Sequence, residues 1–265
     1  METNYLGRDD APVKPETWKL LDETMVTAAK STLAGRRLLN VEGPYGLGLK
    51  GVPLEDCPAG ECLLVSKFVP VHMISTTFTL GVRDLLSYEQ NGLPFTASPL
   101  IEAAIQCASM EDTIIFEGAA GTSGLLNAEG SNSQKLASWN TVGKAADDII
   151  QAMITLDEAG HHGPYALALS PSRYNLLFRR YLQGVGTELE HLKTVVTEGI
   201  FKAPVLKSGG VLIATGKQYA SIVLGQDMTT GFIGPVGDSL EFSISESLAL
   251  LVRDPSSICV LTEKA

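Results

Sequence analysis

Apolar residues recur every three to four positions in several stretches of the chain, and this spacing predicts helices. The first helix is expected at 14–36, with Pro15 in its first turn and Gly35 as the glycine that closes it. The second is expected at 98–118, with Ser98 as its cap and a proline at its first helical position. Further helices are expected at 142–159, 171–181 and 188–197.

Alternating or continuous apolar runs predict strands. Residues 71–80 alternate and are rich in β-branched side chains, and 165–170 has the pattern of a buried strand. Residues 49–70 hold two short apolar runs around a Pro/Cys/Gly loop, which predicts an extended hairpin that projects from the body. Residues 119–140 are expected to form a loop. Further strands are expected at 205–206, 211–214, 220–224, 240–252 and 258–261. The mixed order of helices and strands, without βαβ regularity, predicts an α+β fold.

Composition narrows the class of protein. The chain has 265 residues, of which 45% are hydrophobic and 19% charged. It contains no run near the roughly 18 apolar residues that a membrane span needs. The surplus of apolar side chains is therefore expected in a core or in contacts between subunits. The formal net charge of −10 argues against nucleic acid or an anionic membrane as the main partner.

The sequence offers little catalytic chemistry. It contains no nucleophile elbow, phosphate loop, zinc-protease motif or dinucleotide fingerprint. The adjacent pair His161 and His162 lacks a third ligand for a metal, and no resident metal or cofactor is expected. Consecutive carboxylates cannot both face one site on a helix, so Glu111 and Asp112 are predicted to lie on a solvated face. These features favour a structural protein over an enzyme.

Several short stretches, in a consistent order over nearly the whole chain, carry a resemblance to a known family. They are 35–46 (GRRLLNVEGPYG), 77–80 (TFTL), 111–118 (EDTIIFEG), 124–126 (GLL), 163–167 (GPYAL), 224–227 (LGQD) and 245–248 (SESL). Together they resemble the encapsulin shell proteins, whose fold is that of the major capsid protein of tailed phages (the Hong Kong ninety-seven type). The resemblance implies an intracellular shell subunit, located in the cytoplasm, rather than an enzyme.

The resemblance also implies a domain organisation and partners. The predicted parts are an N-terminal arm and helix, an extended loop, a peripheral domain in two pieces and an axial domain. Their expected bounds are 1–48 for the arm and helix, 49–70 for the extended loop, 71–136 and 224–265 for the peripheral domain, and 137–223 for the axial domain. Sixty copies, the smallest icosahedral closure of one chain type, are expected to assemble around a cargo enzyme. The expected cargo is a ferritin-like iron-storage protein or a dye-decolourising peroxidase.

In this family a C-terminal targeting peptide of the cargo docks on the inner wall of the shell. The resemblance places that docking site at Leu33, Arg36, Asn40, Thr230 and Phe232. An alternative is that Leu33 and Phe232 only pack the first helix onto its domain, and the two interpretations are compatible. The loop around the fivefold pore is expected at Gly184, Val185, Gly186, Thr187 and Glu188.

Other assignments remain open at this stage. Some family members bind a flavin beside a tryptophan, but this chain has Arg83 at that position and Tyr88 as the nearest aromatic residue, so no flavin is expected. One alternative function is a phage or prophage capsid protein of the same fold. A second alternative is a soluble hydrolase whose catalytic residues are scattered along the chain.

Overall fold

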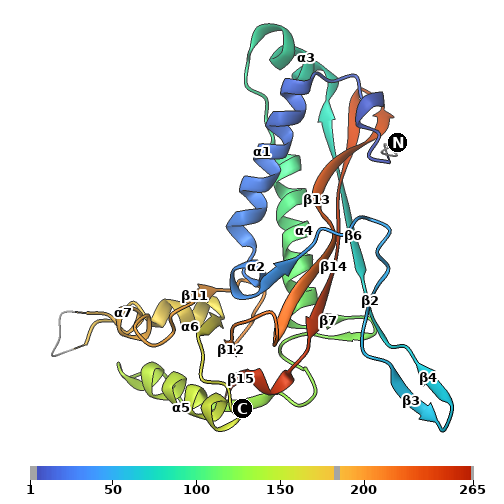
Figure 1. The fold of residues 1–265 in the computed structure, drawn as a ribbon. Helices are drawn as coiled ribbons and strands as arrows, with labels where there is room; N and C mark the ends of the chain where they lie inside the picture. Colours follow the sequence, from blue (N-terminus) through green and yellow to red (C-terminus); the bar gives the residue numbers. More distant parts are fainter. Residues whose placement is uncertain (1–4, 182–185, 264–265) are drawn as a thin grey trace.

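A twisted four-stranded sheet forms the long axis of the molecule (Figure 1). The computed structural model describes residues 5–181 and 186–263. The sheet has the order β1-β13-β14-β6, and its long strands are β6 (His72–Gly81), β13 (Ala220–Val236) and β14 (Ser239–Val252). The short β1 (Asn40–Glu42) runs parallel to β13, whereas the other neighbours are antiparallel. Alternate residues of β6 are buried, so the predicted strand at 71–80 is confirmed.

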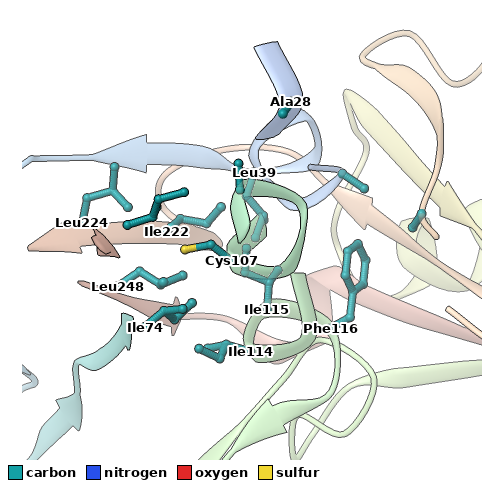
Figure 2. Packing of buried hydrophobic residues seen from close by; sticks show 14 of the residues in the cluster. Ala28, Leu39, Ile74, Cys107, Ile114, Ile115, Phe116, Ile222, Leu224 and Leu248 are labelled. Carbon is teal, nitrogen blue, oxygen red and sulfur yellow. The ribbon is translucent and has the colours of Figure 1, made fainter. Parts of the chain in front are cut away.

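Two long helices, α1 (Pro15–Thr32) and α4 (Ser98–Phe116), lie side by side along this sheet (Figure 1). Their apolar faces and the inner face of the sheet enclose the larger core. Figure 2 shows part of this core, where Cys107, Ile115, Ile222 and Leu248 converge. Ser98 is the first residue of α4 rather than its cap, because Ala97 occupies the cap position. A further helix, α3 (Val82–Asn91), was not predicted.

The first predicted helix is wrong at its C-terminal end. α1 stops at Thr32 because Leu33 takes an extended ψ of 120°, and a second short helix, α2, runs over Gly35–Leu38. Gly35 therefore begins a helix instead of closing one. A side chain there would bring its Cβ within 2.5 Å of Ile115 Cδ1, so glycine is needed for the close approach of α2 to α4.

The predicted extended hairpin is confirmed. β2 (Gly51–Pro53) pairs with β5 (Phe68–Pro70), and β3 (Cys57–Gly60) pairs with β4 (Leu63–Val65). The hairpin stands away from the rest of the chain (Figure 1), and large apolar side chains near its tip are exposed to solvent. Exposed apolar side chains of this kind are typical of a surface that a partner covers.

A second, five-stranded sheet has the order β11-β10-β12-β15-β9. α5 (Lys144–Glu158) packs on it and encloses a separate core, and α6 (Pro171–Leu176) and α7 (Glu188–Leu192) are shorter than predicted. The strands are β9 (Asn132–Leu136), β10 (Tyr165–Leu169), β11 (Gly199–Lys202), β12 (Gly210–Ala214) and β15 (Ile258–Glu263). Residues 205–206, predicted as a strand, form a turn. The short β7 (Gly118–Ala119) and β8 (Thr122–Ser123) pair with each other.

The two sheets group the chain differently from the predicted domain bounds. β9 and β15 belong to the five-stranded sheet, although both lie in segments assigned to the peripheral domain. β13 begins at Ala220 in the four-stranded sheet, before the predicted boundary at 224. β9 was predicted as a loop because its sequence NSQKL is polar, which suits a strand at a sheet edge. No helix within the described ranges is long and apolar enough to cross a membrane.

Candidate docking groove

A groove of about 540 Å³ lies between α1, α2 and the middle of β13. Its floor is apolar and its rim is charged. The apolar side chains that line it are Met25, Val26, Ala29, Leu33 and Met228, and the charged ones are Lys30, Arg36, Arg37 and Asp227. A concave apolar surface with a few polar groups at its edge is typical of a ligand site.

An irregularity in β13 builds one wall of the groove. The pairing of β13 with β14 shifts register between Gln226 and Thr229, so the two intervening residues leave the regular ladder. One of them, Asp227, accepts a hydrogen bond from the backbone N–H of Met228 at 2.8 Å. Met228 then packs against Ala29 and Leu33 on the helix side. The bulge therefore places an apolar side chain opposite α1.

Arg36 lies at the α2 end of the groove and donates to the carboxyl groups of three acidic residues. Its Nε lies 2.8 and 3.0 Å from the two oxygens of Glu111, and its two terminal nitrogens lie 2.7 Å from Asp227 and 2.9 Å from Glu246. The side chains of Glu111 and Glu246 are 0% exposed. The prediction of a solvated face at Glu111 and Asp112 is therefore wrong. Burial of these carboxylates is tolerated because a cation and fixed N–H donors meet them.

Asp112 fixes the start of α2. Its carboxylate accepts backbone hydrogen bonds from Ala34 at 2.9 Å and from Gly35 at 2.9 Å. These are N–H groups that the first turn of a helix cannot satisfy internally. Burial raises the pKa of Asp112 to about 6, against the opposing effect of the two N–H donors. The two adjacent carboxylates thus have different partners on α2.

The charge balance around Arg36 is negative, because one guanidinium faces three carboxyl groups. Burial, reinforced by the neighbouring charge of Glu111, raises the pKa of Glu246 to about 9. Glu246 is therefore protonated at neutral pH. The thiol of Cys107 lies 3.6 Å from it, and burial together with Glu246 raises the pKa of that thiol as well. The guanidinium of Arg36 is thus already paired with acidic side chains of its own chain.

The groove brings together two of the five residues predicted for peptide docking, Leu33 and Arg36. Asn40 is exposed on β1 and lines a separate, smaller hollow. Thr230 is 0% exposed, and Phe232 packs edge-on to Phe242 in the core with a centroid distance of 5.7 Å. Both lie further along β13, where the N-terminal segment covers them.

Sequence reasoning did not assign the other seven lining residues to docking: Met25, Val26, Ala29, Lys30, Arg37, Asp227 and Met228. One signal was present on α1. Val26 adjoins the apolar stripe at Met25 and Ala29, so it widens that stripe beyond what packing on the domain requires, and it is 40% exposed. Met228 gave no such signal, because its position depends on a bulge that the sequence does not mark.

The predicted pore loop is only partly described. Gly184 and Val185 lie outside the described residues. Thr187 caps α7 in a reciprocal pair with Glu190, in which each side chain accepts a backbone N–H of the other residue. The carboxylate of Glu188 is 0% exposed, accepts the N–H of Gly143 at 2.7 Å and pairs with Arg179 at 3.4 Å. Glu188 therefore anchors the base of the loop, and only Gly186 and Thr187 among the described members are partly open to solvent.

The remaining candidate positions are ordinary surface features. Tyr88 on α3 packs edge-on to Phe95 at 5.5 Å, and Arg83 lines an open hollow at the start of the same helix. Among residues 5–181 and 186–263, no group of three His, Cys, Asp or Glu side chains is arranged to hold a metal ion.

Comparison with known proteins identifies the family. The profile of the family described as "Encapsulating protein for peroxidase" matches residues 3–249. The chain is 31% identical to the type 1 encapsulin shell protein of Myxococcus xanthus, over 97% of this chain and 96% of that protein. It is 26% identical to a ferritin-like–encapsulin shell fusion protein of Pyrococcus furiosus, over 89% of this chain and 64% of the fusion.

Solved structures show the same fold. A virus-like particle from Pyrococcus furiosus matches with a TM-score of 0.73 and 22% identity, over 93% of this chain and 99% of that chain. The capsid of Myoviridae phage XM1 matches with a TM-score of 0.58 and 12% identity, over 85% of this chain and 90% of that chain. The predicted capsid fold of tailed phages is thus confirmed. The profile and the relatives together show that this chain belongs to the encapsulin shell proteins.

Proposed function

We propose that this encapsulin shell subunit holds its cargo by binding a targeting peptide of the cargo enzyme in the groove beside α1. The observation that carries the proposal is the apolar floor formed by Met25, Met228 and Val26 between charged residues, with Val26 40% exposed. Unbranched methionine side chains adapt to the shape of a ligand. Such a groove suits aliphatic side chains of an extended peptide, with Lys30 and Arg37 at its edge.

Membership of the family supports a further proposal about the assembly and its contents. We propose sixty copies in an icosahedral shell in the cytoplasm, with no catalytic activity of its own. A ferritin-like iron-storage protein or a peroxidase is the proposed cargo, in line with the family description and with the ferritin-like fusion relative. The capsid-protein alternative is disfavoured, because phage capsids share the fold at only 11–12% identity. The hydrolase alternative has no supporting observation.

The test compares two single substitutions on α1. Val26→Asp places a charge on the apolar floor, and Thr27→Asp places the same charge on the neighbouring exposed position outside the groove. Both chains are expressed with the natural cargo, and the cargo in purified particles is quantified by mass spectrometry. Val26→Asp is expected to give intact, empty shells, and Thr27→Asp loaded ones. Normal loading of the Val26→Asp shell would refute the groove as the docking site.

The loop around Gly186 is proposed to line the fivefold pore. A Cβ at Gly186 would lie 3.2 Å from Glu190 Oε2, the oxygen that accepts the backbone N–H of Thr187 in the cap of α7, so a larger residue acts directly on this loop. Gly186→Leu is expected to slow the passage of small ions to the enclosed cargo, measured as the rate of iron uptake or peroxidase turnover in intact shells. An unchanged rate would show that the gate lies elsewhere.

A further inference from the structure

The N-terminal segment lies along the outer edge of β13 (Figure 1). We call residues 5–8 the arm. The carbonyl of Leu6 accepts the backbone N–H of Phe232 at 2.7 Å, which is a contact of the kind that joins two strands. The hydroxyl of Tyr5 donates to the side chain of Gln226 at the other end. Gly7 has φ +62°, and a Cβ there would lie 2.7 Å from the carbonyl oxygen of Phe232. The arm is therefore fitted closely to this edge.

Arg8 holds the arm in a built site for a guanidinium. Its two terminal nitrogens reach the two oxygens of Asp22 at 2.9 and 2.5 Å, in a forked pair. Its Nε donates to the carbonyl of Thr230 at 2.9 Å, and the hydroxyl of Thr230 lies within hydrogen-bonding distance of both Arg8 and Asp22. The guanidinium carbon lies 4.5 Å from the centre of the Trp18 ring, in a cation–π arrangement.

This site continues the docking groove. Asp22 is one turn before Val26 on α1, and Thr230 is two residues after Met228 on β13. The helix α1 and the strand β13 therefore line both the Arg8 site and the docking groove. Of the three predicted docking residues that lie outside the groove, Thr230 and Phe232 are those that the arm covers. A peptide lying between α1 and β13 would meet the arm at this point.

We propose that the edge of β13 at Thr230–Phe232 is a second peptide-binding segment, and that the arm occupies it within the same chain as a competitor of the cargo peptide. This inference rests on the proposed function of the groove. The arm shows which ligand the segment takes: an extended peptide with an apolar residue, a glycine and then a basic residue. The forked carboxylate of Asp22 and the ring of Trp18 select the basic side chain.

The ion pair between Arg8 and Asp22 holds the arm on β13, but solvent reaches it and the arm can dissociate. Arg8 and Asp22 are half-buried, with side chains 26% and 36% exposed, and an ion pair that solvent reaches to this extent contributes on the order of 1 kcal/mol. A ligand whose site is covered in most molecules binds with an apparent affinity reduced by the uncovered fraction. If the arm covers the segment about nine times in ten, its removal strengthens peptide binding about tenfold.

The probe is a fluorescent protein that ends in Tyr-Leu-Gly-Arg-Asp-Asp, the sequence of residues 5–10, co-expressed with the full chain. Cargo copies per particle are measured by absorbance, and particle integrity is checked by electron microscopy. Arg8→Ala is expected to load several-fold more probe than the wild type. Asp22→Asn, which frees the arm but removes the basic-residue site, is expected to load no more than the untagged fluorescent protein does. Lys207→Ala, an exposed charge change elsewhere, is the control.

Gly7→Val provides an independent second route, because its side chain collides with the carbonyl of Phe232 and displaces the arm. It is expected to raise loading as Arg8→Ala does. Equal or lower loading in both variants would overturn the inference and show the arm to be a fixed wall of the fold. That result would leave the proposed function intact if Val26→Asp still empties the shell of natural cargo. Retention of natural cargo by Val26→Asp would refute the proposed function instead.

Discussion

Two arginines mark the two ends of the channel between α1 and β13, and they use the same chemistry in different surroundings. Arg36 binds Glu111 and Glu246, whose side chains are 0% exposed, whereas Arg8 binds Asp22, which is 36% exposed. Removing one partner of a buried pair costs about 3–5 kcal/mol, but an exposed pair contributes about 1 kcal/mol or less. Arg36 is therefore expected to be essential for the stability of the fold, whereas the contact made by Arg8 can be lost without unfolding the subunit.

Arg36 has a structural role that any test of its part in docking must take into account. Its guanidinium donates to three carboxyl groups of its own chain, so a variant that loses cargo there would also lose the cation that compensates them. Arg36→Asp would add a further negative charge to the cluster. Substitutions at Val26 or Arg8 leave the buried carboxyl groups paired, so a change in cargo loading in these variants reports on docking rather than on stability.

The largest expected effect is that of Arg36→Met. It leaves Glu111 buried without its cation and is expected to destabilise the subunit by about 3–5 kcal/mol. For a chain of this size that corresponds to a fall in Tm of at least about 6 °C. Lys207→Met, an exposed charge removal, is the control in thermal unfolding followed by circular dichroism. A Tm for Arg36→Met within about 2 °C of the control would contradict the structural role.

Asp112→Ala is expected to have the next largest effect. It leaves the backbone N–H groups of Ala34 and Gly35 buried without an acceptor, and each such group costs about 1–3 kcal/mol. Asp112→Asn keeps one acceptor oxygen and is expected to recover part of the loss. The measurement is the midpoint of unfolding in guanidinium chloride for the wild type, Asp112→Ala and Asp112→Asn. Equal midpoints for Ala and Asn would show that Asp112 does not fix the start of α2.

Glu246 gives a prediction for pH. Its pKa is raised from 4.5 to about 9, so the folded state holds a proton that the unfolded state releases above pH 4.5. The contribution to stability is complete below pH 4.5 and is lost as pH rises towards 9. Stability is therefore expected to fall between pH 7 and 8.5, a range in which Asp112 is already ionised. Glu246→Gln is expected to flatten this slope in Tm measured against pH. An unchanged slope in that variant would contradict the assignment.

Arg8→Ala is expected to have the smallest effect on stability. The half-buried pair of Arg8 and Asp22 contributes on the order of 1 kcal/mol, so Tm is expected to fall by about 2–4 °C while probe loading rises. A loss comparable to that of Arg36→Met would show that the two arginines do not differ in the way their burial indicates.

The sequence predicted the main elements where packing dictates a period. The alternation of β6 and the apolar stripes of α1, α4 and α5 follow directly from burial of one face. β9 was missed because its polar sequence shows no such alternation. The end of α1 was missed because Asp112, far along the chain, binds the N–H groups that begin α2.

The site was predictable only in part. Leu33 and Arg36 came from the resemblance, whereas the floor of the groove depends on the bulge at Asp227 and Met228. The buried state of Glu111 depends on an arginine 75 positions earlier in the chain. Charge alone favours a solvated position for such a residue, and only the tertiary partner reverses that expectation.

The most direct test of the account is cryo-electron microscopy of shells purified with their natural cargo. Wild-type shells are predicted to show extra density for an extended peptide between α1 and Met228, and Val26→Asp shells are predicted to lack it. Cargo density that attaches elsewhere on the inner wall, or an unchanged density in the Val26→Asp shell, would contradict the account.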